Sequence, residues 1–99
     1  MYYRFDWDPT KEKTNIRKHK VSFSRAATVF RDLNQLSVYD EGHSDHEDRW
    51  ITMGVDSGGA LQVIVHTFRQ VNESLCEIRI ISARKATFRE SRQYREGSR

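Results

Sequence analysis

The feature of this sequence that most constrains its fold is a hairpin signal in the middle of the chain. Two segments rich in apolar and β-branched residues, 49–55 and 61–68, flank the turn sequence Asp-Ser-Gly-Gly at 56–59. Consecutive glycines adopt positive φ at little cost, and a turn this short joins antiparallel neighbours. Segment 61–68 is mainly apolar on both of its faces, which is typical of a central strand. These observations predict an antiparallel sheet with 61–68 in its interior.

Alternating apolar and polar residues predict three more strands, at 2–7, 36–39 and 75–82. A turn at 70–73 leads into the last of them, and a final helix is expected from residue 83 onward. The resulting order is one strand, two helices, four strands and a helix. We expect one α+β domain over residues 1–99. Its antiparallel sheet, a short N-terminal strand plus a meander, carries two N-terminal helices and is followed by a basic C-terminal helix.

The two expected N-terminal helices differ in their apolar content. Asp8 suits the N-cap of the first helix, with Pro9 at its first position, and Ser22 suits the N-cap of the second. The second helix repeats apolar residues at the spacing of one helical face, so we expect it to pack on the sheet. The first has almost no apolar residue apart from Ile16, and we expect it to lie mostly exposed.

The cysteine content and hydropathy limit the class of protein. The sequence has a single cysteine, Cys76, which excludes an internal disulfide and a cysteine-based zinc site and fits a reducing compartment. Its alternation with Ile78 and Ile80 predicts a core position. No apolar run approaches the roughly 20 residues that a spanning helix needs. We therefore expect a soluble, cytoplasmic protein.

Positive charge is concentrated at the C-terminal end of the chain. Residues 79–99 contain seven Lys/Arg against two Asp/Glu, whereas the other residues contain ten against twelve. The net charge of +3 is thus a local basic feature on a mildly acidic body. Such a feature favours a polyanion or an acidic protein as partner. A solvated surface helix held by Arg–Glu pairs is the alternative.

On a helical wheel, the basic residues of the expected C-terminal helix share one arc with an aromatic. This arc holds Arg84, Lys85, Phe88, Arg89, Arg92 and Arg95. The opposite side offers only small residues and Tyr94 to a core, so the helix should be weakly anchored. Phe88 has three open interpretations: it stacks on an unpaired base, it anchors a partner protein, or it packs in the core.

No standard catalytic signature is present in the sequence. Glycine-rich phosphate loops, nucleophile elbows and cysteine-pair metal sites are all missing from it. In the polar loop 40–48, His43 and His46 with the nearby Asp40 and Asp45 could form a metal site, since imidazole and carboxylate groups are suitable ligands. Their loose spacing favours a solvated loop, and we expect neither a metal nor another cofactor.

An arginine inside a predicted strand is the most informative polar residue. Arg79 lies between apolar neighbours, so it needs an anionic partner, which is Glu77, Glu47 or a ligand phosphate. Glu47 and Arg49 enter a neighbouring strand at alternate positions and should point to one face. A carboxylate and guanidinium groups on one face suit phosphodiester chemistry, as proton acceptor and charge stabiliser. A structural ion pair explains the same residues equally well.

Two histidines are candidates for proton transfer at neutral pH. His66 lies in an apolar strand and is expected to be packed or hydrogen-bonded rather than catalytic. His19 ends the exposed first helix among Arg17, Lys18 and Lys20. Positive neighbours favour its neutral form, which suits a general base, although an ordinary surface histidine remains the alternative.

Several of these segments together resemble the BrnT family. They are Phe-Asp-Trp-Asp-Pro at 5–9, Asn-Ile-Arg-Lys-His-Lys-Val-Ser-Phe at 15–23, Ala-Ala-Thr-Val-Phe at 26–30, Glu-Asp-Arg-Trp-Ile-Thr-Met-Gly at 47–54, Val-His-Thr at 65–67 and Arg-Ile-Ile-Ser-Ala-Arg-Lys-Ala-Thr at 79–87, with Glu90 and Tyr94. The resemblance covers nearly the whole chain. Its clearest departure is Lys20, which replaces the family's glycine after Lys-His. A left-handed helix end there would carry a side chain and some strain.

The resemblance implies a toxin of a bacterial type II toxin–antitoxin module with a RelE-like fold. The implied activity is a ribonuclease that cleaves RNA and stops translation. The implied partner is a BrnA-like antitoxin, a DNA-binding protein through which the complex binds operator DNA. A toxin homodimer within that complex is compatible with the resemblance.

On this interpretation the protein is a metal-independent endoribonuclease in which the ribose 2′-hydroxyl attacks the adjacent phosphate. Arg79 and Arg84 would stabilise the phosphorane and Arg49 would orient them. Glu47 or His19 would act as the base. The RNA would be held by Lys18, Lys85, Phe88 and Arg89. The alternative is a non-catalytic binding module whose basic C-terminal helix docks an antitoxin or DNA.

Overall fold

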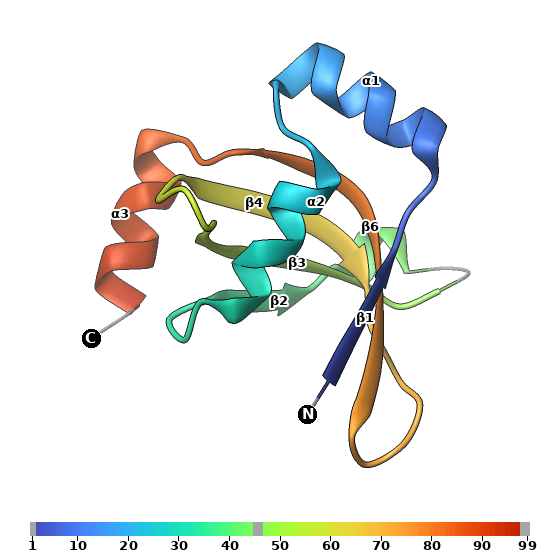
Figure 1. The fold of residues 1–99 in the computed structure, drawn as a ribbon. Coiled ribbons are helices and arrows are strands. Elements are labelled where there is room, and N and C mark those ends of the chain that lie inside the picture. Colours follow the sequence, from blue (N-terminus) through green and yellow to red (C-terminus); the bar gives the residue numbers. More distant parts are fainter. Residues whose placement is uncertain (1, 45–46, 98–99) are drawn as a thin grey trace.

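The computed structural model describes residues 2–44 and 47–97, which form an α+β fold with one sheet (Figure 1). In chain order the elements are β1 (Tyr2–Asp6), α1 (Pro9–His19), α2 (Phe23–Ala27), η1 (Thr28–Arg31), β2 (Leu36–Tyr39), η2 (Glu41–His43), β3 (Arg49–Val55), β4 (Leu61–Thr67), β5 (Arg69–Gln70), β6 (Leu75–Lys85) and α3 (Phe88–Gly97). Here η1 and η2 are short 3-10 helices. The short strand β5 occupies the start of the segment that was expected to be a turn.

The described residues form a six-stranded sheet with the order β1-β6-β4-β3-β2, and β5 pairs with β6. The hairpin of β3 and β4 is confirmed, and Gly59 closes its turn with φ 87°. The expectation of a purely antiparallel sheet was wrong, because β1 pairs with β6 in parallel. This pairing places Tyr3 beside Cys76 and Phe5 beside Ile78. Alternation predicts which residues face a core, but it carries no information on strand direction.

The core lies between the sheet and the segment formed by α2 and η1. Phe23 and Val29 of that segment are fully buried, as are Ile64 and Ile78 of the sheet. Burial of each such side chain stabilises the fold by about 1.5–3 kcal/mol. The second expected helix therefore packs on the sheet as predicted, although its last turn tightens into a 3-10 helix. Cys76 is buried, as its alternation predicted.

Helix α1 is tied to the edge of the sheet through one side chain. Of its residues, all of them described, only Asn15 is buried. Asn15 Nδ2 donates to the carbonyl oxygens of Ala83 at 2.8 Å and Val21 at 3.0 Å, and Asn15 Oδ1 accepts from the Ala83 N–H at 3.0 Å. Beyond the end of β1, the Asn15 amide thus takes the place of a strand as the hydrogen-bond partner of the Ala83 backbone in β6. Lys20 follows with φ 61° and ψ 30°, so the left-handed helix end implied by the family's glycine at this position is present and carries a side chain.

The start of the C-terminal helix differs from the expectation. Strand β6 continues to Lys85 because Arg84 pairs with Val63 of β4, so the predicted helix start at residue 83 was wrong. Helix α3 begins at Phe88 behind a capping box. Thr87 Oγ1 accepts from the Glu90 N–H at 3.2 Å, and a Glu90 carboxylate oxygen accepts from the Thr87 N–H at 2.9 Å. The expected arc of six residues is therefore divided between a strand and a helix.

Helix α3 is weakly anchored, as expected. None of its described residues is buried. Two hydrogen bonds of 2.7 and 2.9 Å join Arg84 to the carboxylate of Glu90 and lower the pKa of Glu90 to about 2. One turn further, the Tyr94 hydroxyl donates to Asp32. Burial and this hydrogen bond raise the pKa of Tyr94 to about 12.

Candidate active site

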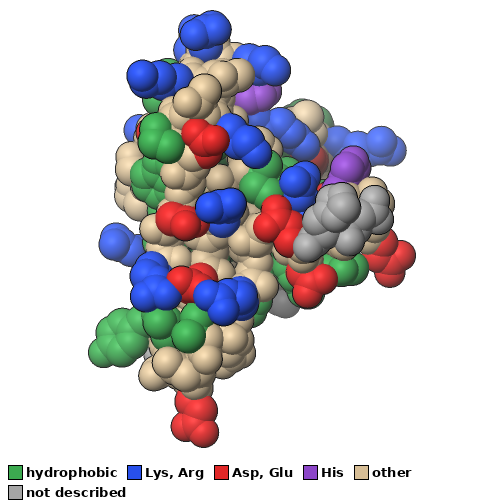
Figure 2. All heavy atoms as spheres, turned by 90° about the vertical axis from the view of Figure 1, so that its right-hand side faces the viewer, with side chains coloured by type: hydrophobic (Ala, Val, Ile, Leu, Met, Phe, Trp, Pro, Cys, Tyr) green, Lys and Arg blue, Asp and Glu red, His purple; other side chains and the backbone are tan. Residues whose placement is uncertain are grey.

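A cleft of about 530 Å³ opens beside β1 and β6. Its walls come from β1, the segment before β3, the end of β4, β5 and β6. The lining residues are Arg4, Phe5, Asp6, Glu47, Asp48, Thr67, Phe68, Arg69, Glu77 and Arg79. Figure 2 shows this side of the molecule, on which acidic and basic side chains alternate. The cleft therefore contains two of the predicted catalytic residues, Glu47 and Arg79.

Three polar residues on adjacent strands form a row at the cleft. Arg49 on β3 is paired in register with Thr67 on β4, so both side chains point to the same face of the sheet. Thr67 Oγ1 in turn accepts from the backbone N–H of Arg79 on β6 at 3.2 Å. The hairpin and the β4–β6 ladder thus bring two predicted arginines to neighbouring positions.

The guanidinium of Arg49 has spare hydrogen-bonding capacity. Its terminal nitrogen lies 3.9 Å from a carboxylate oxygen of Glu47. Its Nε is buried and has no hydrogen-bond partner within the described part of the chain. A buried N–H without an acceptor costs free energy, and an anion would supply the acceptor. Arg49 is therefore suited to bind a ligand oxygen.

The ion pairs of the cleft differ from those expected for Arg79. Its Nε lies 3.6 Å from a carboxylate oxygen of Asp6, and both side chains are more than half exposed. Glu77, an expected partner, instead accepts hydrogen bonds from Arg4 and Arg69. The Arg4 hydrogen bond and the smaller contribution of Arg69 lower the pKa of Glu77. Within the described part of the chain, the ion-pair contact of Arg79 is therefore long and exposed, which leaves its guanidinium open to a phosphate.

The arrangement, rather than net charge, makes this cleft suitable for phosphodiester chemistry. Its lining includes three arginines and four carboxylates. Glu77 accepts hydrogen bonds from two arginines, whereas among residues 2–44 and 47–97 the ion-pair contact of Glu47 is the 3.9 Å one to Arg49. One available carboxylate beside two under-used guanidinium groups is a proton acceptor next to a site for a negatively charged oxygen.

The predicted residues at the end of α1 lie at a different hollow. Lys18 and His19 are exposed and line a depression of about 270 Å³ together with Ile81 and Ser82 of β6. Neither residue lines the cleft that holds Glu47 and Arg79. The structure therefore does not bring the two candidate bases together.

The predicted residues at the end of β6 form a third group. Arg84 lies five positions beyond Arg79 on the same strand, a span of about 16 Å in extended backbone. It is bound to Glu90, and this hydrogen bond raises the pKa of Arg84 further. Lys85 and Arg89 are exposed. Phe88 is 77% exposed, so the core interpretation of this residue was wrong.

His66 is a packed, hydrogen-bonded histidine, as predicted. It is 3% exposed and its ring meets Phe30 edge-on at 4.8 Å. The Nδ1 atom lies 2.9 Å from the carbonyl oxygen of Thr67, and Nε2 lies 2.7 Å from Thr52 Oγ1. Burial lowers the pKa of His66.

The loop that carries candidate metal ligands is only partly described. Asp45 and His46 lie outside the described residues. His43 Nδ1 lies 3.0 Å from a carboxylate oxygen of Asp40. Residues 2–44 and 47–97 contain no group of three or more His, Cys, Asp or Glu that could hold a metal ion.

Sequence reasoning missed four charged residues of the cleft, Arg4, Asp6, Asp48 and Arg69. Alternation in the first strand already placed Arg4 and Asp6 on the face opposite Phe5. The missing information was the parallel pairing, which brings Arg4 beside Glu77 and Asp6 beside Arg79. Arg69 belongs to β5, in a segment that was expected to precede a turn.

The fold and the cleft define a small α+β protein with a site suited to a phosphodiester. A family model described as "Ribonuclease toxin, BrnT, of type II toxin-antitoxin system" matches residues 7–90. The chain therefore belongs to the BrnT family of ribonuclease toxins, which confirms the resemblance seen in the sequence. Membership of a type II toxin–antitoxin system implies a protein antitoxin as partner.

A solved structure supports the fold assignment. The ribonuclease toxin BrnT of Brucella abortus, whose crystal structure was determined at 1.1 Å resolution, superposes with a TM-score of 0.55. The match covers 88% of this chain and 99% of that chain, with 20% sequence identity. At this identity the likeness concerns the fold. No curated protein matches the chain. No described helix is long and apolar enough to cross a membrane.

Proposed function

We propose that this protein is a metal-independent endoribonuclease that cleaves RNA in the cleft lined by Glu47 and Arg79, with Arg49 beside it. The observation that carries the proposal is the meeting of these three residues on adjacent structural elements. Their contacts to carboxylates or guanidinium groups are 3.6 Å or longer. All three groups are thus available to a substrate. By contrast, Arg84 is closely paired with Glu90, and Glu77 is closely paired with Arg4.

The proposed reaction uses a nucleophile that belongs to the RNA. Glu47 takes the proton of a ribose 2′-hydroxyl, and the 2′-oxygen attacks the adjacent phosphorus. The bond from phosphorus to the 5′-oxygen breaks, and the 5′-oxygen takes up a proton as it leaves. Arg79 and Arg49 donate hydrogen bonds to the non-bridging oxygens, where charge accumulates. The products are a 2′,3′-cyclic phosphate and a 5′-hydroxyl end.

Glu47 is a better base candidate than His19 because it lines the same cleft as Arg79. His19 and Lys18 line the hollow beside Ser82 and would contact a neighbouring part of the RNA. At the far end of β6, the exposed residues Lys85, Phe88 and Arg89 would hold the strand further along. Arg84 would contribute to this path as a cation fixed by Glu90.

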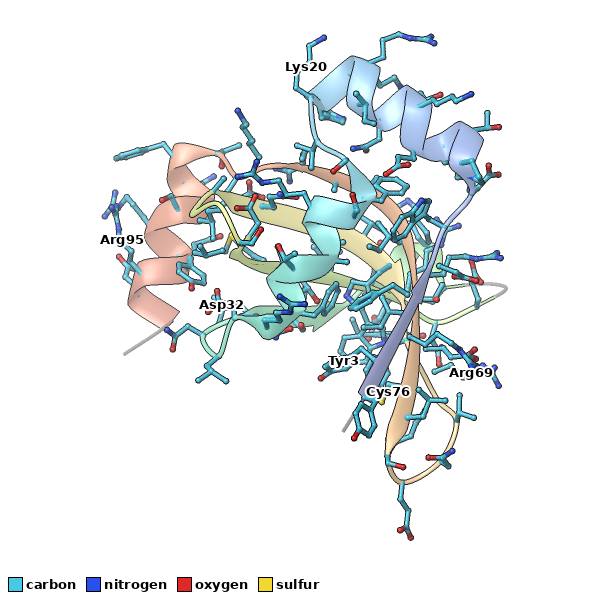
Figure 3. The ribbon with its side chains drawn as sticks, viewed as in Figure 1. Tyr3, Lys20, Asp32, Arg69, Cys76 and Arg95 are labelled. Carbon is cyan, nitrogen blue, oxygen red and sulfur yellow. The ribbon has the colours of Figure 1, made fainter. Side chains whose placement is uncertain are left out.

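The test is RNA cleavage by the variant Arg79→Ala, with Arg95→Ala as the matched control. Arg95 lies on α3 and points away from the sheet (Figure 3). We expect the cleavage rate to fall about 10²–10³-fold in Arg79→Ala, as when one donor of an oxyanion site is removed, and to stay near that of the parent protein in Arg95→Ala. Cleavage should persist with a chelator and leave cyclic phosphate ends. Full activity of a folded Arg79→Ala variant would exclude this site.

The antitoxin contact is proposed at the end of β6 and the start of α3. Phe88 is an exposed aromatic next to the exposed Lys85 and Arg89, which suits an acidic partner surface with an apolar residue at its centre. A BrnA-like antitoxin bound there would neutralise the toxin, carry the complex to operator DNA and release translation from inhibition in the cytoplasm. A co-structure that leaves Phe88 and Arg89 uncovered would contradict this contact.

The same exposed surface also favours the second candidate function, a binding module without catalysis. The two candidates differ in one measurement. If purified protein leaves RNA intact while it binds an antitoxin through Phe88, the binding module is the better description.

A further inference from the structure

A second hollow lies next to the cleft, and we infer that it binds a single nucleobase of the RNA. This inference rests on the proposed function. The hollow has a volume of about 160 Å³, and its walls include Tyr3, Phe30, Trp50 and Phe68. Pockets for drug-sized ligands begin at roughly 300 Å³, so this hollow has room for one ring system. Aromatic walls of this kind bind bases by stacking.

The hollow and the cleft share a wall. Phe68 lines both of them and is 38% exposed. The preceding residue, Thr67, connects the two sites through its hydroxyl, which binds the N–H of Arg79, and its carbonyl oxygen, which binds His66. An RNA strand with a phosphate at Arg79 would therefore have an adjoining base within reach of the far side of Phe68.

The hydrogen bonds at the base of the hollow fix which groups remain for a ligand. The carbonyl oxygen of Thr67 can only accept, so His66 Nδ1 carries the proton and Nε2 accepts from the Thr52 hydroxyl. Thr52 Oγ1 in turn lies 2.7 Å from Ser37 Oγ and, with its own proton committed, accepts from Ser37. Ser37 is left with acceptor capacity only.

Gln35 also lines the hollow, and the donors of its side-chain amide are likewise used within the protein. Its Nε2 donates to the carbonyl oxygens of Phe30 at 3.1 Å and Asp32 at 3.0 Å. These two acceptors require the NH₂ group on that side and leave the amide oxygen as its remaining group. Ser37 and Gln35 therefore offer acceptors to a base.

Acceptors recognise amino groups. Adenine and cytosine carry an exocyclic amino group on the edge used for pairing, whereas uracil and hypoxanthine carry a carbonyl oxygen at the corresponding position. A carbonyl oxygen that faces Ser37 and Gln35 would leave acceptors unpaired, which is unfavourable. The geometry therefore points to a preference for amino-bearing bases over uracil beside the cleaved phosphate.

The test uses tryptophan fluorescence, because Trp50 lines the hollow and the only other tryptophan, Trp7, packs against Phe23. In the variant Trp7→Phe, Trp50 is the sole reporter. Cytidine, adenosine, uridine and inosine monophosphates are the probes. We expect saturable quenching with a half-saturation concentration about tenfold lower for the amino-bearing member of each pair, the effect of one lost hydrogen bond.

A second variant tests the hydrogen-bond assignment. In the Trp7→Phe background, Ser37→Ala should reduce the discrimination between cytidine and uridine monophosphates to about twofold or less. Ser57→Ala, at the exposed β3–β4 turn, should leave it unchanged. Absence of saturable quenching, or equal binding of all four nucleotides by the Trp7→Phe protein, would overturn the inference.

The readout separates this inference from the proposed function because nucleotide binding requires no cleavage. Selective quenching with intact RNA would support the base site and overturn the ribonuclease proposal. Cleavage at the Arg79 cleft without nucleotide binding at Trp50 would support the ribonuclease proposal and overturn the base site. When both hold, Ser37→Ala should also flatten the base preference of RNA cleavage, whereas Arg79→Ala should lower the cleavage rate itself about 10²–10³-fold.

Discussion

The two arginine-rich regions of this protein differ in how their guanidinium groups are used. At the C-terminal end, Arg84 donates two hydrogen bonds to Glu90, and this pair holds the start of α3. At the cleft, Arg79 in its lining and Arg49 beside it have, among the described residues, contacts of 3.6 and 3.9 Å to carboxylates. Arg49 Nε has no partner within the described residues. A cation that is already paired gains little from a phosphate, whereas an under-used cation gains a strong hydrogen bond.

The density of charge along a sequence therefore does not show where a catalytic site lies. The segment 79–99 is the most basic part of the chain, yet its Arg84 stabilises structure. The cleft has more carboxylates than arginines, yet the guanidinium with a spare donor, that of Arg49, lies beside it.

The largest effect is expected for Arg49→Ala. Loss of a donor to the charged oxygens should lower kcat/KM for RNA cleavage about 10²–10³-fold. The free energy of unfolding should change little, because the substitution removes a buried N–H that has no acceptor. Arg89→Ala, an exposed control on α3, should change kcat/KM only a few-fold. Similar losses in the two variants would contradict the division between a reactive cleft and a binding end.

Glu90 is expected to matter for stability and not for catalysis. Glu90→Ala removes both the ion pair and the cap, which should lower the free energy of unfolding by about 1–2 kcal/mol. Glu90→Gln retains a side chain that can cap Thr87, so its loss should be smaller, about 0.5 kcal/mol. Urea unfolding measures both values. A large loss of cleavage in a folded Glu90→Gln variant would indicate that Arg84 takes part in catalysis.

The pH dependence of stability should show two windows. Burial lowers the pKa of His66 from 6.5, so the unfolded chain binds the proton more readily, and stability is complete above pH 6.5 and falls as the pH decreases. The pKa of Glu90 is lowered from 4.5 to about 2, so its contribution is complete above pH 4.5 and is lost toward pH 2. The region around the hollow should therefore lose stability at a higher pH than the C-terminal end.

Urea unfolding between pH 7 and pH 5 isolates the first window, because the stabilising contribution of Glu90 stays almost constant over this range. His66→Gln, which cannot titrate, should unfold with a free energy that no longer falls over this range. A decline of equal size in that variant would assign the effect to another group.

Local signals in the sequence predicted the elements that depend on neighbouring residues. The glycine-rich turn predicted the β3–β4 hairpin, and the spacing of apolar residues predicted the packed face of α2. The direction of β1 and the length of β6 depend on strands distant in the sequence, so alternation could not supply them. For this reason the site prediction placed Arg49 on the correct face but grouped Arg84 with Arg79.

One local signal was present and was overlooked. The sequence Thr-Phe-Arg-Glu at 87–90 is a capping box, and it places the start of α3 after β6 rather than at residue 83. With this boundary, Arg84 and Lys85 belong to the strand. The residues 84–95 then no longer share one helical face, and the arginines fall into two regions, the cleft and the C-terminal end.

The smallest effect is expected at the end of α1. Lys20 adopts φ 61°, a conformation that costs a side chain free energy and that glycine adopts freely. Lys20→Gly should therefore raise the free energy of unfolding by about 0.5–1 kcal/mol, whereas Lys13→Gly in the middle of α1 should lower it by about 1 kcal/mol. Because Lys20 points away from the sheet (Figure 3), cleavage should stay unchanged. A several-fold change in kcat/KM in Lys20→Gly would show that the end of α1, with His19, takes part in the reaction.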